Sequence, residues 1–134
     1  SKQDWRKAGK AYREAIALEP DEPVTYLNLG TILANSGHVV EAAQRFLEAK
    51  ERLTVNSEMW ARATAEAFDM LKRDARSTVA KPEWWNDEEL KALSARVVRA
   101  APNEGGAHNM RANVLSGRGG AAWAKKEQPR SGAE

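Results

Sequence analysis

Residues 24–30 read VTYLNLG and place an aromatic residue, a leucine and a glycine within one expected helix. A glycine inside a helix costs about 1 kcal/mol relative to alanine, so it needs a structural reason. The glycine and the large apolar residues around it lie three or four residues apart and share one helix face, at Tyr26, Leu29, Gly30 and Leu33. A glycine at the centre of such a face favours the close approach of a second helix.

A repeat becomes visible when the sequence is moved along itself until Ala8 meets Ala42. The matched pairs are then Ala8 and Ala42, Tyr12 and Phe46, Ala15 and Ala49, and Tyr26 and Trp60. Each alanine–aromatic–alanine set forms one stripe on a helix, in which the alanines admit a neighbouring helix and the ring fills the space between them. The matched residues are 34 positions apart, since 42 − 8 = 34. A period of 34 residues is typical of helical repeats, whose units bury their apolar faces by stacking.

These positions resemble the tetratricopeptide repeat (TPR) family, whose unit is a 34-residue helix-turn-helix. One complete repeat carries the family's pattern at Tyr26, Leu29, Gly30, Leu33, Gly37, Ala42, Phe46 and Ala49. Thr54 stands where the family has a proline. Residues 84–117 are also similar to segments of TPR-like proteins of unicellular algae. The resemblance implies an all-α, TPR-type α-solenoid of about six helices in antiparallel hairpins, right-handed like other TPR arrays.

The expected helices cover approximately residues 2–18, 23–35, 39–53, 57–76, 87–100 and 106–116. Residues 1–76 would then hold the second helix of one repeat, one complete repeat and the first helix of a third. Residues 77–117 would be a divergent TPR-like continuation with an expanded loop, and residues 118–134 a basic flexible tail. Because the first expected helix is the second helix of its repeat, we expect the chain to be a fragment of a longer protein.

Two helix starts carry capping signals. For the fourth helix, Asn56 is the expected N-cap, and Val55 and Trp60 are the expected hydrophobic staple. For the fifth helix, the expected capping box joins Asn86 to Glu89, and the expected staple joins Trp85 to Leu90.

The last expected helix matches the second when Pro102 is aligned with Pro20. His108 then takes the place of Tyr26, where packing is a more frequent role for the side chain than metal binding. Arg111 falls at the position of Leu29, where it fits the repeat pattern poorly. We therefore expect this helix to be a degenerate repeat.

Catalytic and metal-binding motifs are absent from the sequence. The chain of 134 residues has no cysteine, which excludes disulfides, thiol nucleophiles and cysteine-based zinc sites. Its two histidines, His38 and His108, lie far apart in the sequence. The glycine-rich stretch 117–120 lacks the preceding strand and the Lys-Ser/Thr signature of a phosphate-binding loop. We therefore expect no enzyme activity, no metal and no cofactor.

The charge and hydropathy patterns argue against a nucleic-acid-binding protein and against a membrane-spanning protein. Acidic and basic residues are mixed along the chain, the formal net charge is +2, and this is a weak nucleic-acid signal. Pentatricopeptide arrays, which read RNA, also lack the alanine–aromatic–alanine stripe. No apolar run approaches the roughly 18 residues of a membrane span, and no signal-peptide pattern is visible. We expect an intracellular protein, cytoplasmic or organellar, that does not bind nucleic acid and has no membrane span.

The resemblance implies a partner-binding surface, because the first helices of TPR units line a concave groove. The positions that fall there are Leu27, Asn28, Thr31 and Asn35 on one helix and Glu58, Ala61, Arg62, Ala65 and Asp69 on the next. Amide and guanidinium groups can hold an extended peptide or a carboxylate. Asn28 and Arg62 match two positions of a five-residue carboxylate clamp, but Glu58 stands where a clamp lysine would be.

The expanded loop contains two adjacent tryptophans, Trp84 and Trp85, which are unusual in a loop. Trp84 is either an exposed interface anchor or a side chain that folds back over the region of Phe68 and Leu71. Two functions therefore stay open. The chain is a non-enzymatic scaffold that binds a partner polypeptide in its groove, or a structural accessory subunit of a large complex, docked by its convex face, the Trp84–Trp85 loop and the tail.

Overall fold

The protein is described by a computed structural model that covers residues 1–74 and 80–117. The described residues form six helices and no strand: α1 (Lys2–Leu18), α2 (Pro23–Asn35), α3 (Val39–Arg52), α4 (Glu58–Arg73), α5 (Asp87–Ala100) and α6 (Gly105–Leu115). The expected all-α class is confirmed, and the helix bounds agree with the sequence prediction to within a few residues. The expected C-terminal tail, residues 118–134, lies outside the described residues. None of the six described helices has the length and apolar character needed to cross a membrane.

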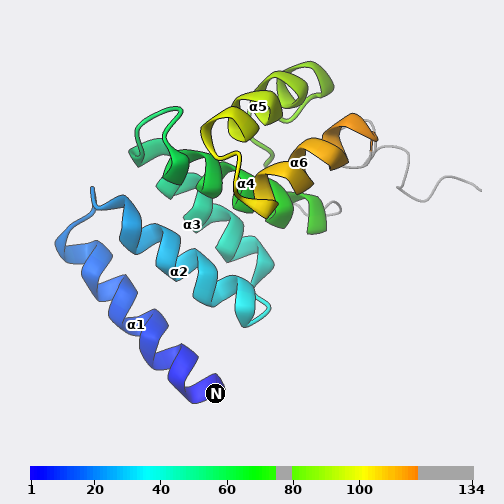
Figure 1. The fold of residues 1–134 in the computed structure, drawn as a ribbon. Coiled ribbons are helices and arrows are strands. Elements are labelled where there is room, and N and C mark those ends of the chain that lie inside the picture. The colour runs from blue at the N-terminus through cyan, green and yellow to red at the C-terminus, as the bar shows by residue number, and fades with distance from the viewer. Residues whose placement is uncertain (75–79, 118–134) are drawn as a thin grey trace, which may run out of the picture.

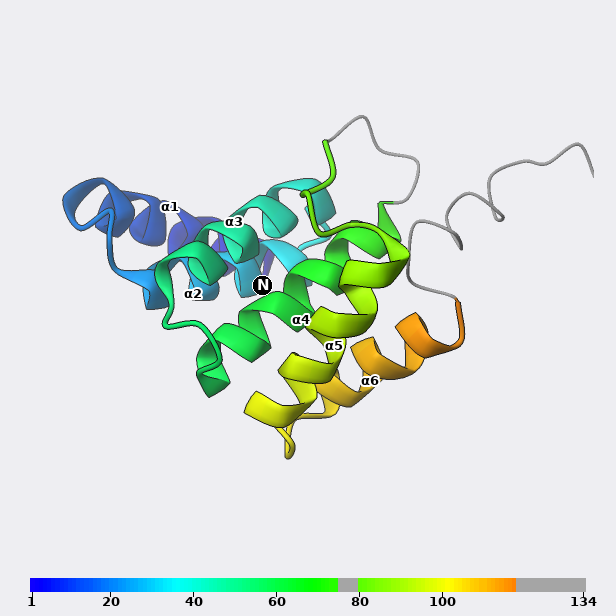
Figure 2. The same cartoon turned by 90° about the horizontal axis from the view of Figure 1, so that it is seen from above.

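The helices follow one another along the molecule. Figures 1 and 2 show α1 at one end and α5 and α6 at the other. From α1 to α4, each helix packs on the next one in the chain, whereas α5 and α6 pack on α4 and on each other.

Helix α4 lies between two apolar clusters. Ala63, Ala67, Met70 and Leu71 pack with α2 and α3 in the first cluster. The other side of α4 joins α5 and α6 in the second cluster, through Trp60, Ala61, Ala65 and Phe68. The small alanine side chains allow helices to approach α4 on both sides, so this helix connects the two halves of the molecule.

The glycine of the VTYLNLG stretch lies in close contact with α3. A Cβ atom built on Gly30 would lie 2.7 Å from the nearest ring atom of Phe46. The side chains of Phe46, Ala42 and Ala49 are fully buried. Gly30 therefore leaves the space that the Phe46 ring fills, and this is the structural reason for a glycine inside α2.

Helix α1 packs less deeply than the sequence pattern indicates. Ala8, Tyr12 and Ala15 are half-buried, and the buried residue of α1 is Gly9. A Cβ on Gly9 would lie 4.0 Å from a methyl carbon of Leu29, which is an ordinary contact distance. Part of the predicted stripe packs against the core, through Tyr12, but the buried position of α1 is Gly9, which faces Leu29 of α2.

The same kind of polar contact, between a side chain and a proline carbonyl, occurs at two places that correspond when Pro20 is aligned with Pro102. The hydroxyl group of Tyr26 donates a hydrogen bond to the carbonyl oxygen of Pro20, 2.8 Å away. Nε2 of His108 lies 2.7 Å from the carbonyl oxygen of Pro102. The first contact is extended by Arg52, whose guanidinium carbon lies 4.3 Å from the Tyr26 ring centroid and whose Nε donates to the same oxygen of Pro20. His108 thus makes the polar contact of Tyr26 but is exposed, so its expected packing role is wrong.

The predicted start of α4 needs a correction. Ser57, not Asn56, is the N-cap, because the Ser57 side chain accepts a hydrogen bond from the backbone N–H of Trp60. Asn56 adopts a left-handed backbone conformation with φ of 69°, which asparagine tolerates better than most residues. With Ser57 as the N-cap, the two staple positions become Asn56 and Ala61, so the predicted pairing of Val55 with Trp60 is not the staple of α4.

The predicted start of α5 is confirmed in its main feature. The Asn86 side chain accepts a hydrogen bond from the backbone N–H of Glu89 at 3.0 Å. The Glu89 carboxylate accepts in return from the amide nitrogen of the Asn86 side chain, rather than from its backbone as in a capping box. Trp85 and Leu90 both pack in the second cluster, as the staple predicts.

Candidate partner-binding surfaces

The predicted binding residues of α2 form an exposed polar row. Asn28, Thr31 and Asn35 are exposed, while the opposite side of the helix is in the core. The Thr31 hydroxyl donates to the carbonyl oxygen of Leu27. The side chains of Asn28 and Asn35 make no hydrogen bond within the described part of the chain, so their amides are available to a partner. Leu27 is 4% exposed, and its predicted place on the open face is wrong.

On α4, Arg62 is the exposed residue of the predicted set that can donate hydrogen bonds. It lies between two fully buried alanines, Ala61 and Ala63. Ala61 and Ala65 are buried in the second cluster, so the prediction that they line an open groove is wrong. The reason is that α5 and α6 cover this side of α4, which the repeat period does not indicate.

Acidic side chains gather further along α4. Glu66 and Asp69 line a small pocket of about 50 Å³ together with Gly106 and Asn109 of α6. Burial raises the pKa of the Glu66 carboxyl above its ordinary value, and the charges of Asp69 and Glu104 raise it further. The charges of Arg62 and Arg73 oppose this shift.

The two tryptophans of the expanded loop have different environments. The Trp85 ring lies 5.4 Å from the Phe68 ring, measured between centroids, so Trp85 is the side chain that folds back over this part of α4. The Trp84 ring lies 5.9 Å from that of Trp85 and is half-buried. Both rings pack against both apolar clusters and help to hold them together.

Trp84 lines a pocket of about 330 Å³ between the end of α3, the start of α4 and the exposed side of α5. Two cations lie in its wall. Nζ of Lys50 is 5.6 Å from the ring centroids of both Trp60 and Trp84. The guanidinium carbon of Arg96 is 5.0 Å from the Trp60 centroid.

Sequence reasoning missed Lys50 and Arg96. They lie on different helices, and Arg96 belongs to the segment that follows the expanded loop, where the sequence no longer follows the predicted repeat. The adjacent Trp84–Trp85 pair was the one available signal, since it marked the loop that closes this pocket.

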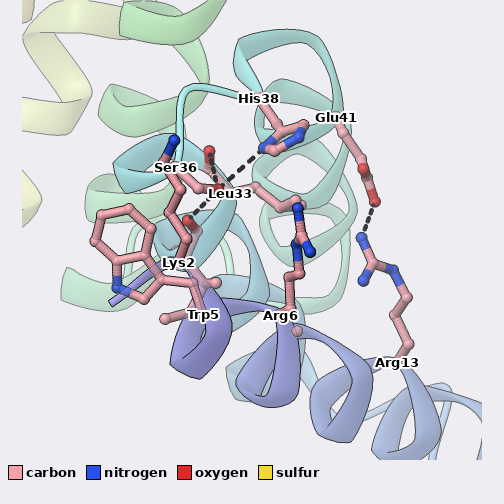
Figure 3. Close-up of a pocket in the computed structure, with 10 residues that line it drawn as sticks. Lys2, Trp5, Arg6, Arg13, Leu33, Ser36, His38 and Glu41 are labelled. Carbon is pink, nitrogen blue, oxygen red and sulfur yellow. Dashed lines mark hydrogen bonds and ion pairs between the residues drawn. The ribbon is translucent and has the colours of Figure 1, made fainter.

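A second pocket, of about 380 Å³, lies between the first half of α1 and the turn from α2 to α3. Figure 3 shows Lys2, Trp5 and Arg6 of α1 on one side of it and Ser36 and His38 on the other. The Ser36 hydroxyl lies 3.0 Å from Nδ1 of His38.

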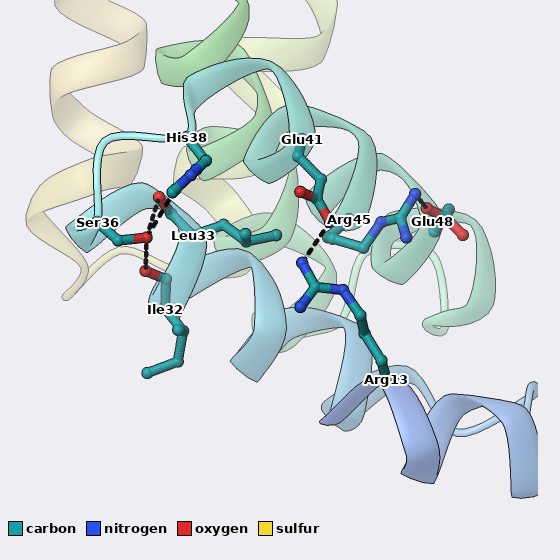
Figure 4. Close-up of polar contacts among 8 residues, drawn as sticks. All are labelled: Arg13, Ile32, Leu33, Ser36, His38, Glu41, Arg45 and Glu48. Carbon is teal, nitrogen blue, oxygen red and sulfur yellow. Dashed lines mark hydrogen bonds and ion pairs between the residues drawn. The ribbon is translucent and has the colours of Figure 1, made fainter. Parts of the chain in front are cut away.

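Two ion pairs lie on the surface beside this pocket. Nη2 of Arg13 lies 2.8 Å from Oε2 of Glu41 and thereby joins α1 to α3. Arg45 and Glu48 form a second pair within α3 at 2.7 Å (Figure 4). Glu41 thus neutralises one of the arginines of the α1 pocket.

The charged and imidazole groups do not assemble into a metal site in the part of the chain that the structure describes, where no three His, Asp or Glu side chains are suitably placed. A comparison with models of known families finds no match to this chain, and a comparison with curated proteins finds no significant similarity.

Proposed function

We propose that the chain is a non-enzymatic protein-interaction scaffold of the tetratricopeptide-repeat type. In this proposal it binds a partner polypeptide by the α2–α4 face, which we define as the exposed side chains of Asn28, Thr31, Asn35 and Arg62. The partner segment would lie in a concave groove formed by the first helices of successive repeats.

The observation that carries this proposal is the division of α2 into two faces. One face fits α3 through Gly30 and Phe46, while the other presents Asn28 and Asn35, whose amides have no hydrogen-bond partner in the described residues. Arg62 lies one repeat period after Asn28 and is exposed as well. Amide and guanidinium donors of this kind suit the backbone carbonyls and carboxylates of an extended peptide.

Two further observations support the assignment. The Pro20–Tyr26 and Pro102–His108 contacts have the same spacing, as expected of related units. Both histidines are engaged within the fold, His38 with Ser36 and His108 with the Pro102 carbonyl. These contacts give each imidazole a structural role that does not require catalysis.

The alternative is a structural accessory subunit of a large complex, organellar or otherwise, docked by its convex face, Trp84–Trp85 and the tail. The half-buried Trp84 beside a pocket favours it. The tail lies outside the described residues and adds no structural support.

The two functions separate in a quantitative pull-down with mass spectrometry, in which the chain of residues 1–134 is the bait. The double variant Asn28→Ala/Arg62→Ala should reduce recovery of a partner by about five-fold or more, since each lost donor to a charged or backbone acceptor weakens the complex. Gln44→Ala/Arg99→Ala is the matched control, because both residues are exposed on other helices.

Loss of the partner with Trp84→Ala, while the double variant on the α2–α4 face has no effect, would establish docking and overturn the scaffold proposal. Catalytic turnover of a substrate by the purified chain would overturn the proposal that the protein is not an enzyme.

A further inference from the structure

The pocket beside Trp84 holds two positive charges, those of Lys50 and Arg96, that form no ion pair with an acidic side chain of the described residues. Arg96 donates two hydrogen bonds to the neutral amide oxygen of Asn56, at 3.2 and 3.1 Å. Glu89 lines the same pocket, and its carboxylate accepts from the neutral Asn86 side chain at 2.6 Å, which leaves its formal charge in place. Two cations and one carboxylate give the lining a formal charge of +1.

The environment of Lys50 is unfavourable for its charge. Burial lowers the pKa of Lys50, and the positive charge of Arg96 lowers it further, while Glu51 opposes the shift. Both cations are half-buried and lie against tryptophan rings, which places them in the wall of the pocket. An anion placed between them would replace repulsion with two attractive interactions.

The rest of the pocket decides which anion fits. Val55, which is 58% exposed, and Leu93 add an apolar wall. A ligand with an anionic group next to an aliphatic group therefore matches the lining. A nucleic acid matches it less well, because Trp60 is 2% exposed and has Lys50 and Arg96 against its ring. That ring is not available for the base stacking that single strands use.

We propose that this pocket, lined by Lys50, Val55, Trp60, Trp84, Leu93 and Arg96, binds an acidic peptide segment of a partner protein. One carboxylate of the segment lies between Lys50 and Arg96, and a neighbouring aliphatic side chain packs against Val55 and Trp84. This site uses none of the residues of the α2–α4 face, so it goes beyond the function proposed above and does not depend on it.

Fluorescence anisotropy with a dye-labelled peptide, acetyl-Asp-Leu-Asp-Leu-Asp-Leu-amide, tests the proposal on the chain of residues 1–134. The peptide should bind saturably, and the analogue with Asn in place of each Asp should bind about ten-fold more weakly or not at all, because it lacks the charge. Lys50→Gln and Arg96→Gln should each weaken binding by about five-fold or more, since each removes one of the two cations.

Matched controls keep the result specific. Lys91→Gln and Arg99→Gln remove cations at exposed positions of α5 outside the pocket and should leave binding unchanged. Circular dichroism melting of every variant separates loss of binding from loss of fold. Arg62→Gln should also bind the peptide normally, so failure of the α2–α4 face and failure of this pocket are distinguishable.

Three results would overturn the inference. They are the absence of saturable binding by the acidic peptide, equal binding of the Asn analogue, and unchanged affinity in folded Lys50→Gln and Arg96→Gln. Tighter binding of single-stranded oligothymidylate than of the peptide, lost in the same two variants, would reassign the pocket to nucleic acid and likewise overturn it.

Discussion

Gly30 and Phe46 lie so close that a Cβ atom on Gly30 would be 2.7 Å from the Phe46 ring. Phe46 is fully buried, so the ring cannot move aside cheaply. Gly30→Ala should therefore destabilise the protein, because overpacking costs about 1–3 kcal/mol and outweighs the gain of about 1 kcal/mol in helix propensity. Urea unfolding measures the difference in the free energy of unfolding.

Two further variants make this prediction specific. Gly105→Ala is the control, since a Cβ there meets nothing within 4 Å, and it should change stability by no more than about 0.5 kcal/mol. Combining Gly30→Ala with Phe46→Leu should cost less than the sum of the two single changes, because the smaller side chain makes room. Strict additivity would contradict the assigned contact.

The all-helical fold was predictable because its signals are local. The bounds of α2 follow from Pro23 at its start and the turn at Gly37, and those of α5 from Asn86 and Pro102. The depth at which α1 packs was not predictable. A stripe of small residues identifies the face of α1 that meets α2, but the burial of Gly9 rather than of Ala8 or Ala15 depends on how the two helices cross.

The N-cap of α4 supplies a second test. Ser57→Ala should lower the free energy of unfolding by about 0.5–2 kcal/mol, because the N–H of Trp60 loses its acceptor. Ser57→Gly should cost only a few tenths of a kcal/mol, since glycine tolerates an N-cap backbone and leaves the N–H accessible to water. Thermal unfolding of both variants gives the comparison, and an equal, negligible cost would show that Ser57 is not the cap.

Adjacent cap-forming residues limit what a sequence can decide. Asn56 and Ser57 both suit an N-cap, and the assignment to Ser57 follows from the left-handed backbone at Asn56, which turns the chain into α4. The candidate site shows the same limit. The exposed positions of Asn28, Thr31 and Asn35 on α2 follow from helix periodicity. By contrast, the placement of Lys50 and Arg96 in one pocket depends on how α5 lies against α4.

Arg111, at the position where the predicted repeat has a leucine, joins α6 to α5. Its Nη1 donates to the carbonyl oxygen of Lys91 at 2.7 Å and to the hydroxyl of Ser94 at 3.0 Å. Arg111→Ala should cost about 1.5–3 kcal/mol of stability, since charged hydrogen bonds are lost and the Ser94 hydroxyl is buried.

Hydrogen exchange gives a local readout for this change. Amide protection should fall in α6 more than in α2 of the Arg111→Ala variant, because the broken contacts tie α6 to α5. Arg99→Ala, at an exposed position of α5, is the control and should leave protection unchanged. Equal loss of protection in all helices would mean that Arg111 acts on the whole fold and not on the docking of α6.

Glu66 should make stability depend on pH in a direction that its surroundings determine. Burial, Asp69 and Glu104 raise the pKa of Glu66 above 4.5 in the folded chain, against the opposing charges of Arg62 and Arg73. The folded state therefore binds more protons than the unfolded state between 4.5 and the raised pKa, so this contribution to stability is complete below 4.5 and is lost as the pH rises through the folded pKa. Glu66→Gln should unfold at a higher urea concentration than the wild-type chain at pH 7, and the difference should shrink on acidification through this window. A carboxyl carbon NMR titration of Glu66 checks the cause directly, and a midpoint at or below 4.5 would contradict it.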